Sequence, residues 1–204
     1  MAFNEKEWHN EERICNCKGD EKMEEQNKKS KSKELMSWVW PILIAIVIAF
    51  VVRQFLISPV TVKGESMEPT YHDNDRIMIW KPGSIDRDDV IVFQSPVEDD
   101  HYIKRVIGLP GDTVKVEDEK LFVNGKEVKE PYIEKAAQTY EEEVGDQYTV
   151  DFTMQEVTGE KTVPKDSYFV LGDNRPNSSD SRMYGFIKRD AIDGKVLFRY
   201  YPWK

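Results

Sequence analysis

The chain has 204 residues, a mass of 23.9 kDa and a formal net charge of −9, which suits one folded domain with accessory segments. The acidic balance argues against a nucleic-acid-binding protein, because such proteins are usually basic. Both cysteines, Cys15 and Cys17, lie near the N-terminus, so a disulfide scaffold and a cysteine protease are excluded for the main body. The three histidines form no H-E-x-x-H pair, which excludes a zincin site.

Residues 1–34 are almost entirely polar, with eight Lys or Arg and nine Asp or Glu. Such a composition is typical of a disordered tail. A metal site on Cys15, Cys17 and His9 is an alternative. Two reduced thiols in a mobile tail explain the same residues better, because no second pair of ligands is present.

An apolar run follows the tail. Between Glu34 and Arg53 lie 18 residues without charge, of which sixteen are apolar. As a helix they would cover about 27 Å, close to the hydrocarbon thickness of a bilayer. Trp38 and Trp40 lie where interfacial aromatic residues are expected. We therefore predict a transmembrane helix over residues 35–57.

A cleaved signal peptide is the main alternative to a permanent anchor. Its apolar region would be shorter, about 7–15 residues, and Ile57-Ser58-Pro59 is a poor cleavage site. We expect an uncleaved, single-pass anchor in the cell membrane and its lipid bilayer. The tail would be cytoplasmic and residues 58–204 extracellular, because four lysines gather just before the span, namely Lys28, Lys29, Lys31 and Lys33.

Residues 58–204 are predicted to form a mostly β domain with an antiparallel sheet, because short runs of β-branched and aromatic residues recur between turn signals. Asn124-Gly125 is a hairpin signal. The acidic stretch 134–146 is expected to be a solvated loop in an insertion around 117–160. The predicted strands cover 60–63, 76–80, 90–93, 102–107, 113–116, 121–123, 148–154, 168–171 and 196–201.

Three segments of this domain carry candidate chemistry. In 64–70 (GESMEPT), Ser66 lies in a turn made by glycine and proline, either as an ordinary turn residue or as a hydroxyl presented to a ligand together with backbone N–H groups. In 102–112, Lys104 interrupts an apolar strand, either as an edge lysine in water or as a lysine desolvated for function. The polar loop 172–182 (GDNRPNSSDSR) is either an exposed loop or a group that orients catalytic side chains.

In this order behind one apolar span, the three segments resemble the sequence boxes of type I signal peptidases. These are membrane-bound Ser/Lys endoproteases that remove signal peptides from exported preproteins. The resemblance covers about residues 36–200 and includes 89–93 (DVIVF) between the serine and lysine segments. The short body and the glycine two positions before the serine are most similar to Gram-positive members. The resemblance implies cleavage of preproteins after a small-x-small (Ala-x-Ala) site, without a metal or cofactor.

The resemblance also implies roles for individual residues. Ser66 would be the nucleophile, Lys104 the general base, and Ser178 a hydrogen-bond partner of Lys104. The backbone at Ser66 and Gly64 would form the oxyanion site, although some members carry a hydroxyl residue where this chain has glycine. The other implied residues are Val60, Val62 and Ile103 in small substrate pockets, and the ion pairs of Asp173 with Arg105 and of Asp180 with Arg182.

A lysine serves as a base only when it is neutral. Holding it neutral at pH 7 requires lowering its pKa by about 3.4 units, or about 4.6 kcal/mol, from a free value of about 10.4. Burial against apolar surface supplies shifts of this size. We therefore expect a more alkaline activity optimum than that of a histidine-based protease.

Other functions remain open from sequence alone. A maturation peptidase for pilus or conjugative-transfer proteins is poorly separated from a signal peptidase. A self-cleaving repressor-type protease would need a DNA-binding module where this chain has an anchor. An inactive membrane-tethered β module that binds exported proteins, or a small adhesin, explains the anchor and the strands but not the three polar segments.

Overall fold

The computed structural model describes residues 37–202, so the predicted tail 1–34, with its two cysteines, lies outside the described residues. The architecture is mostly antiparallel β-sheet preceded by one apolar helix, as predicted. The chain divides into two compact units between Val52 and Arg53. The second unit carries all the strands and the three candidate segments.

The apolar helix covers Ser37–Phe55, with a mean hydropathy of 2.0, and none of its apolar window is buried. Among the described residues it is the one helix long and apolar enough to cross a membrane, which fits membrane anchoring. It ends two residues before the predicted boundary. Pro59 disfavours helical backbone at the residue before it, and the first strand begins at Ile57.

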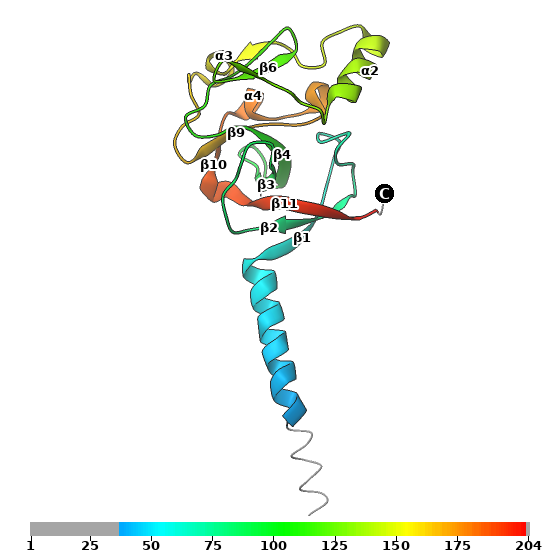
Figure 1. Ribbon diagram of the computed structural model, residues 1–204, viewed down its shortest axis with the longest axis vertical. Helices are drawn as coiled ribbons and strands as arrows, with labels where there is room; N and C mark the ends of the chain where they lie inside the picture. The colour runs from blue at the N-terminus through cyan, green and yellow to red at the C-terminus, as the bar shows by residue number, and fades with distance from the viewer. Residues whose placement is uncertain (1–36, 203–204) are drawn as a thin grey trace, which may run out of the picture. The chain divides into compact units, whose positions relative to one another are not determined.

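The larger sheet has seven strands in the order β1-β2-β11-β3-β4-β9-β10, and all its pairings are antiparallel. Strand β11, near the C-terminus, lies between β2 and β3, so segments far apart in sequence share one sheet (Figure 1). The strands are β1 (Ile57–Thr61), β2 (Arg76–Trp80), β3 (Val90–Gln94), β4 (His101–Gly108), β9 (Ser167–Leu171), β10 (Ile187–Lys188) and β11 (Ile192–Tyr201).

The smaller sheet has the order β7-β6-β5-β8; three of its strands fall within the predicted insertion 117–160, whereas β5 ends where the insertion begins. Its strands are β5 (Val114–Glu117), β6 (Lys120–Val123), β7 (Lys126–Val128) and β8 (Phe152–Thr153). The predicted hairpin at Asn124-Gly125 is confirmed, because both residues have positive φ angles, 54° and 74°, and join β6 to β7. In Figure 1 this sheet lies at the opposite end of the second unit from β1 and β2.

Two sequence predictions in the insertion are wrong. The expected loop 134–146 is mainly the helix α2 (Glu134–Val144), which ends at a left-handed Gly145 with φ 73°. None of its residues is fully buried, but Ala136, Ala137 and Tyr140 are half-buried and form a short apolar stripe, which the surrounding charged residues obscure in the sequence. The expected strand 148–154 shrinks to β8, because Thr153 forms a capping box that begins α3 (Met154–Thr158).

Short helical turns complete the chain. They are η1 (Arg175–Asn177), α4 (Ser181–Tyr184) and η2 (Arg189–Ala191). Buried apolar side chains hold the two sheets together, since one cluster joins Val114 and Leu121 of the small sheet to Ile107 of β4 and Phe169 of β9. Strand β4 therefore contacts the large-sheet core and also carries the junction to the small sheet.

Candidate active site

The serine segment is a turn anchored on both sides of Ser66. Gly64 has a φ of +81°, a conformation that favours glycine, and its N–H donates to Oδ1 of Asp73 at 2.9 Å. Met67, which follows the serine, is completely buried. Ser66 is half-buried, and among the described residues no hydrogen bond engages its backbone N–H. Of the two positions expected to form the oxyanion site, Ser66 has a free donor, whereas the N–H of Gly64 is already bonded.

Lys104 lies in the middle of β4 and is buried, with 3% of its surface exposed. Its Nζ donates to Oγ of Ser66 at 2.6 Å and to the backbone oxygen of Ile103 at 3.0 Å. The ring of Tyr102 lies 5.3 Å from the same Nζ. Strand β4 and the serine turn, 38 residues apart, thus bring an amine and a hydroxyl into direct contact.

Burial lowers the pKa of Lys104 from its ordinary value of 10.5 to about 8. The cause is desolvation, which disfavours the ammonium form. The carboxylates of Asp180 and Asp173 oppose the shift without cancelling it. A lysine with this pKa is neutral in roughly one molecule in ten at pH 7 and in about half at pH 8, and a general base must be neutral to accept a proton.

The third segment packs directly against the serine turn. The N–H of Asn174 donates to the backbone oxygen of Ser66 at 3.0 Å. At Gly172 a Cβ atom would lie 2.5 Å from that same oxygen and 2.1 Å from Oγ of Ser178, so no larger residue fits without displacement. The loop and the serine turn are therefore in close backbone contact.

Ser178 lies beside this contact, but the hydrogen bond predicted between it and Lys104 is absent. Its Oγ is buried and has no partner among the described residues. The Nζ of Lys104 is instead engaged by Ser66 and by the backbone of Ile103. A buried hydroxyl without a hydrogen-bond partner is rare and costs free energy. The Oγ of Ser178 therefore remains available to a group that enters the site.

Both predicted ion pairs form. Arg105 follows Lys104 on β4 and binds Asp173 through Nε–Oδ1 at 2.9 Å and Nη2–Oδ2 at 2.6 Å. Arg182 binds Asp180 through two contacts of 2.8 Å each. Asp180 also accepts from the N–H of Gly172 at 3.0 Å, so the second pair fixes the loop backbone.

Sequence reasoning missed several residues that complete the site. Thr70 donates through Oγ1 to Oδ2 of Asp173 at 2.5 Å, and Tyr148 donates through its hydroxyl to the backbone oxygen of Asp173 at 2.8 Å. The short spacing of Thr70 from Ser66 could have signalled the first contact. Nothing in the sequence points to Tyr148, because it comes from the insertion.

A groove of about 550 Å³ runs past the Ser66–Lys104 contact. The three predicted pocket residues, Val60, Val62 and Ile103, all line it. At its rim His101 bonds Asp193 at 2.6 Å, so this histidine is paired away from the serine. Within residues 37–202 no group of three or more His, Cys, Asp or Glu side chains is arranged to hold a metal ion.

A buried amine in contact with a serine hydroxyl beside a groove is an arrangement suited to acyl transfer. Comparisons with known proteins identify the family of the chain. The family described as "Signal peptidase, peptidase S26" matches residues 35–203. The chain belongs to this signal peptidase family. It is similar to signal peptidase IB of Staphylococcus aureus, with 41% identity over 179 residues, which are 84% of this chain and 92% of the relative.

Two further comparisons agree. Signal peptidase I of Bacillus licheniformis is 40% identical over 186 residues, covering 89% of this chain and 96% of the relative. A crystal structure of a signal peptidase I from Enterococcus faecalis matches with a TM-score of 0.53 and 43% identity, covering 57% of this chain and 98% of that chain. The chain is thus an enzyme, a serine peptidase of the signal peptidase I family that processes preproteins.

Proposed function

We propose that the chain is a membrane-bound signal peptidase in which Ser66 is the nucleophile and Lys104 the general base. One observation carries the proposal: the Nζ of a buried lysine lies 2.6 Å from a serine Oγ beside an apolar groove. A serine hydroxyl is a weak nucleophile until a base takes its proton, and the lowered pKa of Lys104 makes this amine able to do so.

The reaction follows from these positions. Neutral Lys104 accepts the hydroxyl proton of Ser66 while Oγ attacks the carbonyl carbon of the scissile peptide. The backbone N–H of Ser66 donates to the oxyanion. The resulting ammonium of Lys104 then protonates the departing amine, which releases the mature protein. Lys104 next deprotonates a water molecule, which hydrolyses the acyl-enzyme and frees the signal peptide.

The groove supports recognition of small side chains before the cut. Its apolar walls come from Val60 and Val62, on and after β1, and from Ile103 of β4. An extended peptide lying along such strands gains backbone hydrogen bonds, and shallow apolar pockets reject bulky side chains. We therefore assign an Ala-x-Ala preference to this groove.

The location of the reaction is part of the proposal. The helix Ser37–Phe55 would span the cell membrane, with residues 1–34 in the cytoplasm and residues 58–204, including the insertion around 117–160, outside the cell. Ser66 follows the apolar span by few residues, so cleavage would take place at the outer membrane surface. The exported preprotein would present its cleavage site there, and no metal or cofactor takes part.

The test uses detergent-solubilised full-length protein and a preprotein with an Ala-x-Ala site. Wild type, Ser66→Ala, Lys104→Ala and Ser178→Ala are compared from pH 6 to 10 with a chelator present. We expect cleavage after the second alanine by wild type and none by the Ser66 and Lys104 variants. Cleavage by folded Lys104→Ala would show that another group is the base. A silent wild type would favour a maturation peptidase or a binding module instead.

A further inference from the structure

An acidic side chain from the segment between β7 and α2 contacts the polar loop 172–182. Both carboxylate oxygens of Glu130 contact the guanidinium of Arg175, Oε1 with Nη2 and Oε2 with Nη1 at 3.3 Å. The Arg175 side chain is fully buried, and 10% of the Glu130 side chain is exposed. A buried guanidinium is costly without a carboxylate, so Glu130 determines whether Arg175 is stable in this place.

The side chain of Arg175 folds back onto the backbone of its own loop, residues 172–182. Its Nε donates to the backbone oxygen of Gly172 at 2.8 Å, and its own backbone oxygen accepts from Nη2 of Arg182 at 2.9 Å. Its Nη1 lies 3.4 Å from Oγ1 of Thr149, a second residue of the insertion. The charge that Glu130 neutralises therefore fixes the backbone between residues 172 and 175.

The same backbone touches the proposed nucleophile. The N–H of Asn174 donates to the oxygen of Ser66, and its Nδ2 donates to the oxygen of Glu65 at 3.1 Å. Gly172 packs against Ser66 so closely that a Cβ there would overlap its oxygen. A displacement of this loop would thus move the peptide units on both sides of Ser66, including the N–H assigned to the oxyanion.

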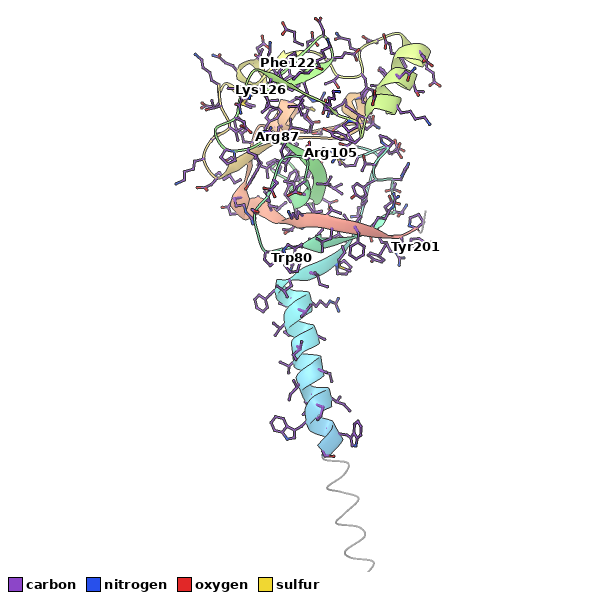
Figure 2. All side chains as sticks on the ribbon, viewed as in Figure 1. Trp80, Arg87, Arg105, Phe122, Lys126 and Tyr201 are labelled. Carbon is purple, nitrogen blue, oxygen red and sulfur yellow. The ribbon has the colours of Figure 1, made fainter. Side chains whose placement is uncertain are left out.

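Tyr132 joins this contact to the second buried cation. Its hydroxyl donates to Oε1 of Glu130 at 2.7 Å, and its ring lies 3.8 Å from Cζ of Arg105. Burial raises the pKa of Tyr132, which keeps the hydroxyl protonated and able to donate. Figure 2 labels Arg105 on the large sheet, and Phe122 and Lys126 on the small sheet.

We infer that Glu130 is a positioning residue for the peptidase reaction. Through Arg175 it sets the backbone of residues 172–174, and through that backbone it sets the orientation of Ser66. The small-sheet insertion is then part of the active centre and not only a cover for the core. This inference rests on the proposed function of Ser66, and its test includes a readout that does not depend on cleavage.

The first test compares Glu130→Gln with two controls, in the full chain and with the Ala-x-Ala preprotein. Glu130→Gln keeps the shape of the side chain but removes its charge. We expect kcat to fall about tenfold or more with KM within about twofold, because a misplaced nucleophile slows the chemical step without removing the groove. Glu127→Gln, an exposed glutamate on β7, should leave both constants unchanged.

A general loss of stability must be distinguished from a displacement of Ser66. Leu121→Ala removes a buried side chain from the core of the small sheet and lowers Tm without touching the Glu130–Arg175 contact. At a temperature where both variants are folded, Leu121→Ala should keep nearly the kcat of wild type. Equal losses of kcat in both variants at equal Tm would overturn the inference. Tyr132→Phe, which keeps the ring under Arg105, should lower kcat about two- to fivefold.

Amide hydrogen exchange supplies the second readout. In Glu130→Gln, peptides covering 64–70 and 172–178 should exchange at least about tenfold faster, because the loop and the serine turn loosen together. The same peptides should keep wild-type protection in Leu121→Ala. Unchanged exchange in Glu130→Gln would refute the inference whether or not the protein cleaves the preprotein, whereas a silent wild type with the expected exchange would refute only the proposed function.

Discussion

Strand β4 buries two neighbouring cations in two different ways. On the groove side, Lys104 faces a hydroxyl and apolar walls, and its pKa falls to about 8. On the other side, Arg105 meets Asp173 in a double contact and stacks on the ring of Tyr132. The first region holds a buried amine without a directly bonded carboxylate, so it gives up its charge easily, whereas the second keeps a permanent charge.

This contrast shows that neighbouring residues of one strand can have different roles, one as a titratable amine and the other as a permanent ion-pair partner. A guanidinium does not lose its proton in proteins, so it is suited to a permanent ion pair. An amine shifts its pKa readily when buried, so it is suited to proton transfer. Replacing Lys104 by arginine should therefore abolish proton transfer, whereas replacing Arg105 by lysine should weaken the ion pair and lower stability.

The largest expected effect comes from Lys104→Arg. The variant keeps a cation in the groove but removes the ability to become neutral, so kcat should fall about 10³-fold or more. Cleavage of the Ala-x-Ala preprotein measures this effect, and Arg105→Lys is the matched control. Because Arg105 does not transfer a proton, its variant should lose stability and keep an unchanged pH profile. Activity of Lys104→Arg near that of wild type would remove the distinction between the two regions.

The next largest effect is expected on the side of β4 where Arg105 is paired with Asp173. Asp173→Asn leaves the buried guanidinium of Arg105 without its carboxylate and should lower the free energy of unfolding by about 3–5 kcal/mol. Thermal unfolding in detergent measures the loss. Asp100→Asn, which affects an exposed pair with Lys63, should leave stability nearly unchanged. A small loss of stability in Asp173→Asn would show that the buried Arg105 does not depend on the carboxylate of Asp173.

Gly172→Ala tests the close contact that links the two regions. Its Cβ would collide with Oγ of Ser178 and the oxygen of Ser66, so we expect destabilisation by about 1–3 kcal/mol and a fall in kcat of about tenfold or more. Gly111→Ala is a useful comparison, because its Cβ would meet nothing within 4 Å and only its φ of +90° is unfavourable. Full activity of Gly172→Ala would contradict the assigned contact.

The smallest effect concerns the stability cost of the groove lysine. The pKa of Lys104 is lower folded than unfolded, so below pH 8 both states are protonated and the folded state carries the full penalty. Between pH 8 and about 10.4 the unfolded state binds the extra proton, and the penalty disappears as pH rises. Lys104→Met should therefore raise stability by about 1–2 kcal/mol at pH 7, after the loss of two hydrogen bonds, and by less at pH 10. A gain that grows with pH would show that the lysine is not desolvated.

The sequence predicted the parts of this site that short motifs encode. Ser66 and Lys104 stand out in segments whose residue types and order are visible in one dimension, and the family resemblance of these segments implied the two ion pairs. The structure forms both ion pairs and places Ser66 beside Lys104. The groove residues Val60, Val62 and Ile103 were also placed correctly at the groove. The β class followed from alternating apolar runs, and the Asn124-Gly125 hairpin followed from turn chemistry.

The parts that sequence reasoning missed depend on long-range contacts. Tyr148 and Glu130 come from the insertion and bind residues of the polar loop 172–182. No local sequence pattern distinguishes them from other polar residues. The helix α2 has only a short, half-buried face, made by Ala136, Ala137 and Tyr140 among charged residues, so its acidic sequence was taken for a solvated loop. Ser178 was placed in the site, but its hydroxyl orientation depends on side-chain packing, which sequence does not encode locally.

The lowered pKa of Lys104 has a consequence for the enzyme at rest. With a pKa of about 8, Lys104 is neutral in roughly one molecule in ten at pH 7, and under the proposed mechanism only these molecules can react. Under the same mechanism, a preprotein in the groove would displace water from the amine and favour its neutral form further. Substrate binding would then raise the fraction of reactive enzyme, and the empty enzyme would be mostly in the protonated form that cannot attack other proteins.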